Sequence, residues 1–168
     1  MLVHGAGSRA NIFRAPIPQT LVDTLVADGY DVWLENWRAS IDVEPSEWTL
    51  DQAAVHDHPK AIETIVRKTG WDKVKAIVHC QGATSFILSA VAGLLPQVKL
   101  ILSNAVSLHP VMSPATHFKL RQLVPLLSRW TSYLDPQRGS DPRACSPGRS
   151  PSWCEPPITS ATTPCASW

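Results

Sequence analysis

A cysteine at the junction of a predicted strand and a predicted helix is the residue best placed for chemistry. Cys80 lies in Val-His-Cys-Gln-Gly at 78–82, between the apolar run 74–79 and a helix-like stretch at 81–93. A sharp strand-to-helix turn that exposes a nucleophile usually has the pattern Gly-x-Ser-x-Gly. Gly82 gives this strained turn the small residue that it needs on its far side. We therefore predict that Cys80 is a nucleophile for acyl transfer, and the alternative is a buried cysteine that only closes a strand.

Two features of the turn bear on that prediction. A helix N-terminus directs free N–H groups and a positive dipole end at the side chain, which favours a thiolate. Valine stands at position 78, where glycine is usual. Val78 implies either a locally adjusted neighbouring strand or a less demanding turn.

Backbone N–H groups near Cys80 are predicted to hold the oxyanion of an acyl-transfer reaction. The N–H of Gln81, directly after the nucleophile, is the first donor. The second comes from the loop His-Gly-Ala-Gly at 4–7, where we assign it to Ala6. Gly5 and Gly7 would let this backbone approach the substrate closely. The alternative is an ordinary glycine turn, and His4 is expected to be a structural hydrogen-bonding residue rather than the base.

A cysteine nucleophile also needs a base, and the base needs an orienting acid. The best-placed base is His109, because it follows the predicted strand 98–106 at the edge where ligands bind. The alternative interpretation is that His109 is a loop histidine without a catalytic role. Asp57 is expected to cap a helix or to accept a local hydrogen bond. The remaining histidines, which offer no better base, are His56, His58, His79 and His117.

Strand-like and helix-like segments alternate along the first 134 residues, which predicts an α/β fold with a doubly wound, mostly parallel sheet. We expect strands at 1–5, 31–36, 74–79 and 98–106, and helices at 18–28, 49–70 (broken in two at Pro59), 81–93 and 115–134 (interrupted at Pro125). Arg38 is expected to pair with Glu35 or Asp42. Trp33 and Trp37 should pack at the sheet edge, or line an acyl or sterol pocket.

Composition excludes several classes of function. The chain has 168 residues and a net charge of +1, from 15 basic and 14 acidic residues, so nothing favours nucleic acid or an anionic membrane surface. No apolar run is long enough to span a membrane, and no signal peptide is evident at the N-terminus. We therefore predict a cytoplasmic protein. The cysteines match no zinc spacing, and we expect neither a metal nor a cofactor.

The last part of the chain differs in composition from the rest. Residues 135–168 are rich in Pro, Ser and Cys and contain no Val, Leu or Phe. Such a segment buries too little apolar surface to offset its ordering entropy. We predict one partial domain at 1–134 and a disordered tail at 135–168. The abrupt change also suggests the hypothesis of translation in a shifted reading frame.

Three separated motifs resemble the acid-lipase branch of the α/β-hydrolases. They are GYDVWLENWRAS (29–40), LDQAAVHDHPKAIETIVRKTG (50–70) and VHCQGATSF (78–86), in the family's order, and together the likeness covers nearly all of residues 1–110. The first motif also looks like the hydrolase part attached to bacterial cholesterol-oxidase-like flavoenzymes. The resemblance makes Cys80 the nucleophile, Gln81 and the 4–7 loop the oxyanion donors, and the chain a fragment.

The same resemblance implies a substrate and partners. The substrate would be an apolar ester of a lipid or sterol, cleaved through a cysteine acyl-enzyme, with a flavin oxidoreductase as partner or fused domain. The family's acid and base follow later strands that this chain lacks, so we expect weak or absent activity. Two alternatives stay open. One is a cysteine-dependent acyltransferase similar to polyhydroxyalkanoate synthases, and the other is a hydrolase-like binding module without turnover.

Overall fold

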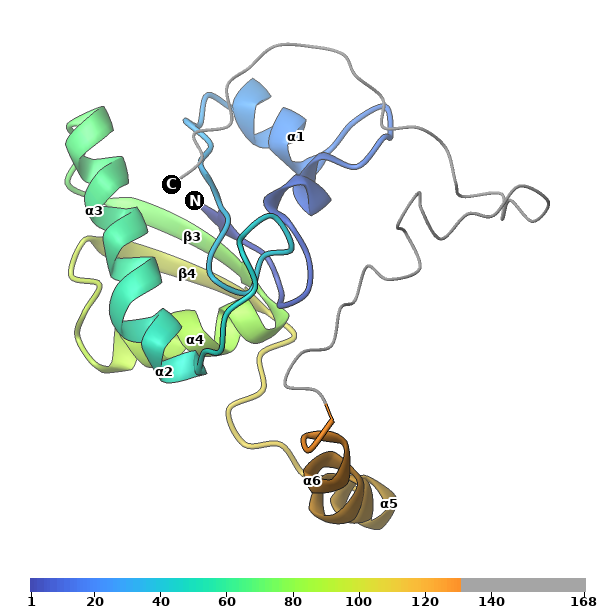
Figure 1. The fold of residues 1–168 in the computed structure, drawn as a ribbon. Coiled ribbons are helices and arrows are strands. Elements are labelled where there is room, and N and C mark those ends of the chain that lie inside the picture. Colours follow the sequence, from blue (N-terminus) through green and yellow to red (C-terminus); the bar gives the residue numbers. More distant parts are fainter. Residues whose placement is uncertain (131–168) are drawn as a thin grey trace.

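The computed structural model describes residues 1–130, and the predicted tail at 135–168 lies outside them. The described chain forms a four-stranded parallel sheet in the order β2-β1-β3-β4 (Figure 1). The strands are β1 (Leu2–Val3), β2 (Leu34–Glu35), β3 (Val74–His79) and β4 (Val98–Asn104). The sheet is the predicted one, although β2 is shorter than the segment 31–36 and β4 ends before residue 106.

The helices are arranged as a doubly wound sheet requires. They are α1 (Leu21–Ala27), α2 (Leu50–Gln52), α3 (His58–Thr69), α4 (Cys80–Val91), α5 (Pro114–Phe118) and α6 (Val124–Leu127), with a 3₁₀ turn at Ala10–Arg14 and π turns at Ala53–Asp57 and Lys119–Leu123. The chain leaves β1 toward one edge and returns past it to β3, so right-handed crossovers place α1 opposite α3 and α4. Figure 1 shows α1 well apart from α3 and α4, which contact each other.

The core lies around β1 and β3, where alternating side chains of β3 face the helices. Val74, Ala76 and Val78 are buried, while Lys75 between them is exposed. Both residues of β1 are buried, as expected for a strand with neighbours on two sides. The largest core side chains are those of Trp37, Phe86 and Ile62. Burial of these apolar groups holds α4 and α3 against the sheet.

The prediction that Pro59 breaks the long helix is wrong, because the helix continues through it. The turn before the proline widens into a π turn at Ala53–Asp57, in which the N–H of His58 bonds to the carbonyl of Ala53. A π turn moves the preceding carbonyls away from the proline ring, with which they would clash in a regular α-helix. The helix around Pro125 behaves in the same way, since the N–H of Val124 bonds to Lys119.

The π turn leaves one buried carbonyl for another helix to satisfy. In the π spacing the carbonyl of Ala54 would accept from residue 59, but a proline has no N–H. The Ser89 hydroxyl of α4 donates to this carbonyl instead. A buried carbonyl without a donor is unfavourable, so Ser89 joins α4 to the π turn through a hydrogen bond that the proline makes necessary.

Candidate active site

The turn after β3 has the backbone of a nucleophile elbow. β3 ends at His79, α4 begins at Cys80, and Cys80 has a φ of 55°. A left-handed conformation is unfavourable for a residue with a Cβ and persists only where the surroundings enforce it. The Cys80 side chain is a free thiol and the residue is exposed. His79 provides no side-chain cap, so the first N–H groups of α4 stay available for a ligand.

Gly82 brings α4 into direct contact with the end of β1. A Cβ at this position would lie 2.2 Å from the carbonyl oxygen of His4 and 3.0 Å from Cγ1 of Val3. Only glycine fits there, as the elbow pattern predicts. The valine at position 78 is fully buried, and the ladders through Val78 are regular, pairing it with Val3 and Ser103. The turn therefore accommodates valine at 78 without an adjusted neighbouring strand.

The loop at 4–7 lies against the elbow. A Cβ on Gly5 would come within 2.9 Å of Cys80 Cβ and 3.5 Å of its Sγ. This contact lies between β1 and β3, where the winding of the sheet reverses, and ligands of open α/β sheets bind at such a point. Gly7 has a φ of 66° and donates its N–H to the carbonyl of Ala39. The N–H of Ala6 has no acceptor within residues 1–130, so it is free to bind a ligand.

His4 is held as a buried, structural residue. Its Nδ1 donates to the Gly5 carbonyl at 2.6 Å, and its own carbonyl accepts from Nε1 of Trp37 at 2.9 Å. Nε2 is buried and has no partner among the described residues. Burial lowers the pKa of His4 more than the Gly5 carbonyl and nearby carboxylates raise it, so the ring is neutral near pH 7.

His109, the predicted base, lies in an exposed bend after β4. The structure shows no hydrogen bond or ion pair between this histidine and another residue of the described chain. Its role as a base therefore stays a prediction, as do the roles of Cys80, Gln81 and Ala6.

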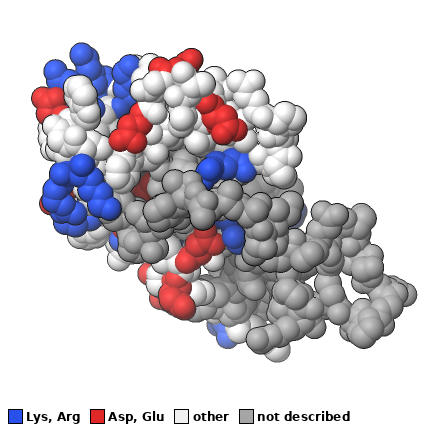
Figure 2. All heavy atoms as spheres, turned by 90° about the horizontal axis from the view of Figure 1, so that it is seen from above, with Lys and Arg blue, Asp and Glu red and all other residues white. Residues whose placement is uncertain are grey.

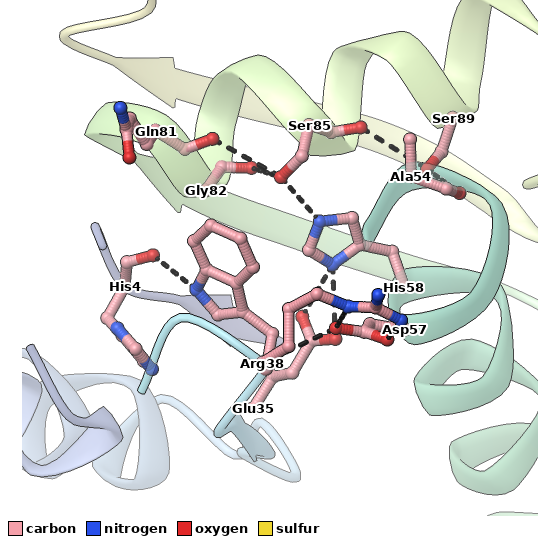
Figure 3. A network of polar contacts seen from close by, with 11 residues as sticks. His4, Glu35, Arg38, Ala54, Asp57, His58, Gln81, Gly82, Ser85 and Ser89 are labelled. Atoms are coloured by element: carbon pink, nitrogen blue, oxygen red, sulfur yellow. Dashed lines mark hydrogen bonds and ion pairs between the residues drawn. The ribbon is translucent and has the colours of Figure 1, made fainter. Parts of the chain in front are cut away.

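Sequence reasoning missed a buried network behind the elbow (Figure 3). Nδ1 of His58 lies 2.9 and 3.1 Å from the two carboxylate oxygens of Glu35, and its Nε2 lies 2.7 Å from Oγ of Ser85. All three residues are buried. Two signals in the sequence point to it: a glutamate ends an otherwise apolar strand, and Ser85 shares a helical face with Phe86 and Ser89.

The prediction that Arg38 pairs with Glu35 or Asp42 is wrong, because Arg38 pairs with Asp57. Asp57 accepts from the Arg38 backbone N–H at 3.0 Å and from its Nε and Nη2 at 2.8 and 2.7 Å. Glu35 is occupied by His58, and Asp42 pairs with Arg9 at 3.4 Å. Burial alone would raise the pKa of Asp57, but the hydrogen bonds from Arg38 outweigh it and the pKa is lowered. Asp57 therefore neither caps the helix nor accepts a local hydrogen bond, the two roles that the sequence predicts, but accepts from a residue 19 positions away.

Trp37 lies two residues beyond β2, the strand at one edge of the described sheet. It is 2% exposed, and its ring packs edge-on against Trp48, with centroids 5.3 Å apart. Next to it, at the carboxyl end of β2, an open hollow of about 390 Å³ is lined by residues that include Val43, Asp57 and Lys60. Trp37 is itself among the residues that line this hollow, and it separates the hollow from the core.

Charged side chains of both signs are interspersed on the face seen in Figure 2, as the small net charge implies. Among residues 1–130, no three His, Cys, Asp or Glu side chains are grouped so that they could hold a metal ion. In the same part of the chain, no helix has the length and apolar character needed to cross a membrane.

Comparison with known proteins gives consistent results. Residues 1–155 match the family model described as "alpha/beta hydrolase fold". Gastric triacylglycerol lipase of Rattus norvegicus is 35% identical over 95 residues, 49% of this chain and 24% of that protein. Sterol esterase 2 of Saccharomyces cerevisiae is 25% identical over 146 residues (77% and 27%), and lipase member J of Homo sapiens 26% over 147 (79% and 38%). The matched part of the chain thus spans 24% to 38% of the length of these relatives.

Proposed function

Because the chain belongs to the α/β-hydrolase fold family, we propose that Cys80 is the nucleophile of an ester-cleaving site. The observation that carries the proposal is the left-handed backbone of Cys80 at the start of α4, directly against Gly5 of the loop after β1. A thiol held in this way meets the carbonyl carbon of an ester while free N–H groups face the carbonyl oxygen.

The reaction has two covalent steps. The Cys80 thiolate attacks the ester carbonyl, and the oxygen of the tetrahedral intermediate is stabilised by the N–H groups of Gln81 and Ala6. The carbon–oxygen bond then breaks, the alcohol leaves with the proton that the thiol gave up on ionising, and an acyl thioester stays on Cys80. Water attacks the thioester in the second step, which releases the carboxylic acid and restores the thiol.

We propose that the second step is slow in this chain. Activating water requires a base, and His109 is the only predicted one. Without an ordered base and acid, a preformed oxyanion site still supports some acylation, because it acts independently of the base. The expected behaviour is one round of acylation followed by weak or absent turnover.

The proposed substrate is a lipid-like ester. The support for this proposal is that relatives are named as a triacylglycerol lipase and a sterol esterase. The flavin enzyme as partner or fused domain and the cytoplasmic location stay predictions.

A p-nitrophenyl ester assay on the full chain tests the nucleophile. We expect a burst of about one p-nitrophenolate per chain, as for an acyl-enzyme that accumulates, and a matching mass increase on the tryptic peptide 76–99. Cys80→Ala should remove both. Cys145→Ala, which removes another cysteine, should leave both unchanged. Equal product release from the wild type and Cys80→Ala would overturn the proposal and favour a binding module.

The cysteine itself favours a second candidate, acyl transfer to an acceptor other than water. A thioester is consumed by thiols and amines more readily than an oxygen ester, so Cys80 suits transfer better than serine would. Adding a small thiol acceptor to the acylated protein distinguishes the two. Faster loss of the acyl group with formation of the acceptor's thioester would support transfer, and an unchanged rate would leave hydrolysis.

A further inference from the structure

Three buried polar side chains from three elements form a chain that ends on the first turn of α4. Glu35 ends β2, His58 begins α3 and Ser85 lies within α4, with exposed fractions of 4%, 0% and 0%. The Ser85 hydroxyl also lies 3.2 Å from the carbonyl oxygens of both Gln81 and Gly82. The chain of contacts therefore runs from the end of β2 to the two residues that follow Cys80 (Figure 3).

The protons in this network can be counted. Carboxylate oxygens only accept, so Nδ1 of His58 carries a proton and donates to Glu35. If the imidazole is neutral, Nε2 accepts the single hydroxyl proton of Ser85. The carbonyls of Gln81 and Gly82, called the elbow carbonyls below, then accept no hydrogen bond from this hydroxyl. If the imidazole is protonated, Nε2 donates to Ser85 Oγ, and the hydroxyl proton is directed at the Gln81 or Gly82 carbonyl.

A donor to these two carbonyls affects the elbow in two ways. It fixes the peptide planes of the first turn, which hold Cys80 in its left-handed conformation. It also polarises the N–H groups of Gly82 and Ala83, which belong to the same peptide units as these carbonyls. A hydrogen bond to a carbonyl strengthens the donor at the other end of its peptide unit. Those N–H groups point out of the helix N-terminus, where a Cys80 thiolate would lie.

The surroundings suit a positioning role and exclude a second active site. The rings of Trp37 and Phe86 pack on His58, with centroids 5.7 and 5.2 Å away, and Ser85 is inaccessible to any substrate. Asp57 precedes His58 but is paired with Arg38. The carboxylate that contacts the imidazole is that of Glu35.

We propose that Glu35, His58 and Ser85 are positioning residues that set the reactivity of Cys80 through the first turn of α4. Glu35 fixes the His58 ring through Nδ1, a ring that donates from Nε2 directs the Ser85 hydroxyl at the carbonyls of Gln81 and Gly82, and those carbonyls align the N–H groups at the thiolate. This inference rests on the proposed function only in treating Cys80 as the reacting group.

The test measures thiol alkylation rather than ester cleavage. Folded full-length protein is treated with iodoacetamide, and labelling of Cys80 is followed on the tryptic peptide 76–99, separately from the other cysteines. We expect Ser85→Ala to slow labelling at pH 7 by about threefold or more, the effect of losing one hydrogen bond that acts on the helix N-terminus.

Ser89→Ala is the matched control. Ser89 is buried one turn further along α4, and its hydroxyl bonds to Ala54 and Ser85 without reaching Gln81 or Gly82. Both variants should lower the melting temperature, but Ser89→Ala should leave the labelling rate unchanged. Equal slowing in the two variants, or none in Ser85→Ala, would overturn the inference.

A pH series on Glu35→Gln provides a second readout that a merely structural role would not change. The glutamine keeps an acceptor for Nδ1 but removes the negative charge that faces the ring. The labelling rate of the wild type should exceed that of Glu35→Gln at low pH, and the two rates should converge as the pH rises. The other charged groups near the ring are Asp57 with its partner Arg38, and His4 beyond the Trp37 ring. A ratio that is constant with pH would contradict the relay.

The two proposals fail in distinguishable ways. If wild-type Cys80 labels no faster than the thiol of N-acetylcysteine at the same pH, the activated nucleophile of the proposed function is wrong. If the wild type is faster and Ser85→Ala equals it, the nucleophile stands and the positioning role falls.

Discussion

Two neighbouring strands, β3 and β4, begin with the same residues and end in the same unusual backbone. Their sequences are VKAIVH and VKLILSN, they pair in parallel, and each is followed by a residue with positive φ, 55° at Cys80 and 56° at Ala105. β3 lies between two strands and is largely buried. β4 has one strand neighbour within residues 1–130, and its Leu100 and Leu102 are 57% and 60% exposed.

The comparison shows that a left-handed turn after a strand does not by itself make a site. Cys80 differs from Ala105 in its neighbours, which are the backbone of Gly5 and a helix whose first-turn carbonyls lie within hydrogen-bond distance of the Ser85 hydroxyl. Within the described residues, the turn after β4 leads instead into the exposed segment 105–130, which is tied to α4 through the contacts of Ser107 with Thr84. The site therefore arises from the neighbours of β3.

The largest expected effect comes from adding a methyl group where α4 meets β1. Gly82→Ala places Cβ against the His4 carbonyl, a backbone atom that cannot move without disrupting β1, so we expect a loss of about 3 kcal/mol or more of unfolding free energy. Gly93→Ala, before β4, meets nothing within 4 Å and should lose only about 1 kcal/mol, from its φ of 74°. Urea denaturation measures both, and similar losses would remove the distinction between the two strands.

Shortening a side chain on each strand gives the next effect. Val78→Ala empties space in the core and should lower the unfolding free energy by about 2.5 kcal/mol. Leu102→Ala removes more carbon from an exposed position and should change it by less than about 0.5 kcal/mol. A large loss in Leu102→Ala would mean that the face of β4 is covered in solution.

A carboxylate near the elbow side of the sheet makes stability depend on pH. The folded pKa of Asp57 lies below the ordinary 3.8, so its contribution is complete above that value and is lost as pH falls through the lowered one. Asp57→Asn should lower the unfolding free energy at pH 7 by about 2 kcal/mol, because Arg38 loses charged acceptors, and should flatten the decline below pH 4. Glu63 also has a lowered pKa, from its exposed pairing with Lys60, so Glu63→Gln should flatten the acid decline less, and an equal change would refute the assignment.

The smallest effect tests whether the two left-handed residues store similar strain. Ala105→Gly relieves an unfavourable φ but adds freedom to the unfolded chain, so we expect a net gain of about 0.5 kcal/mol. Comparing Cys80→Gly with Cys80→Ala should give a gain of the same size after β3. A gain at only one of the two positions, measured by thermal unfolding, would show that the turns differ in strain as well as in surroundings.

Regular alternation of apolar residues made most of the fold predictable. Strand 74–79 was predicted to the residue, and the helix after it to within two residues at either end, because β-branched runs and a glycine mark them locally. The elbow was predictable because its glycine and its position after a buried strand are sequence features. The path of the chain at Pro59 was not, since a π turn depends on a donor from α4.

Partners between distant segments were the hardest to predict. Glu35 and His58 are adjacent only because β2 and α3 fold together, and nothing in their spacing reveals the contact. The prediction for Arg38 failed for the same reason. Carboxylates near in sequence were considered first, while Asp57 became the partner because the competing acids were occupied by His58 and Arg9.

The hydrogen bond between Ser89 and the π turn has an evolutionary consequence. Pro59 creates the vacant carbonyl at Ala54 and Ser89 fills it, so each residue makes sense in the presence of the other. Replacing Pro59 restores a backbone N–H within the helix and makes Ser89 dispensable. Losing Ser89 alone leaves the buried carbonyl of Ala54 without a donor. The order in which the two substitutions can be fixed is therefore constrained, and we expect this pair, one residue on each of two helices, to vary together among relatives.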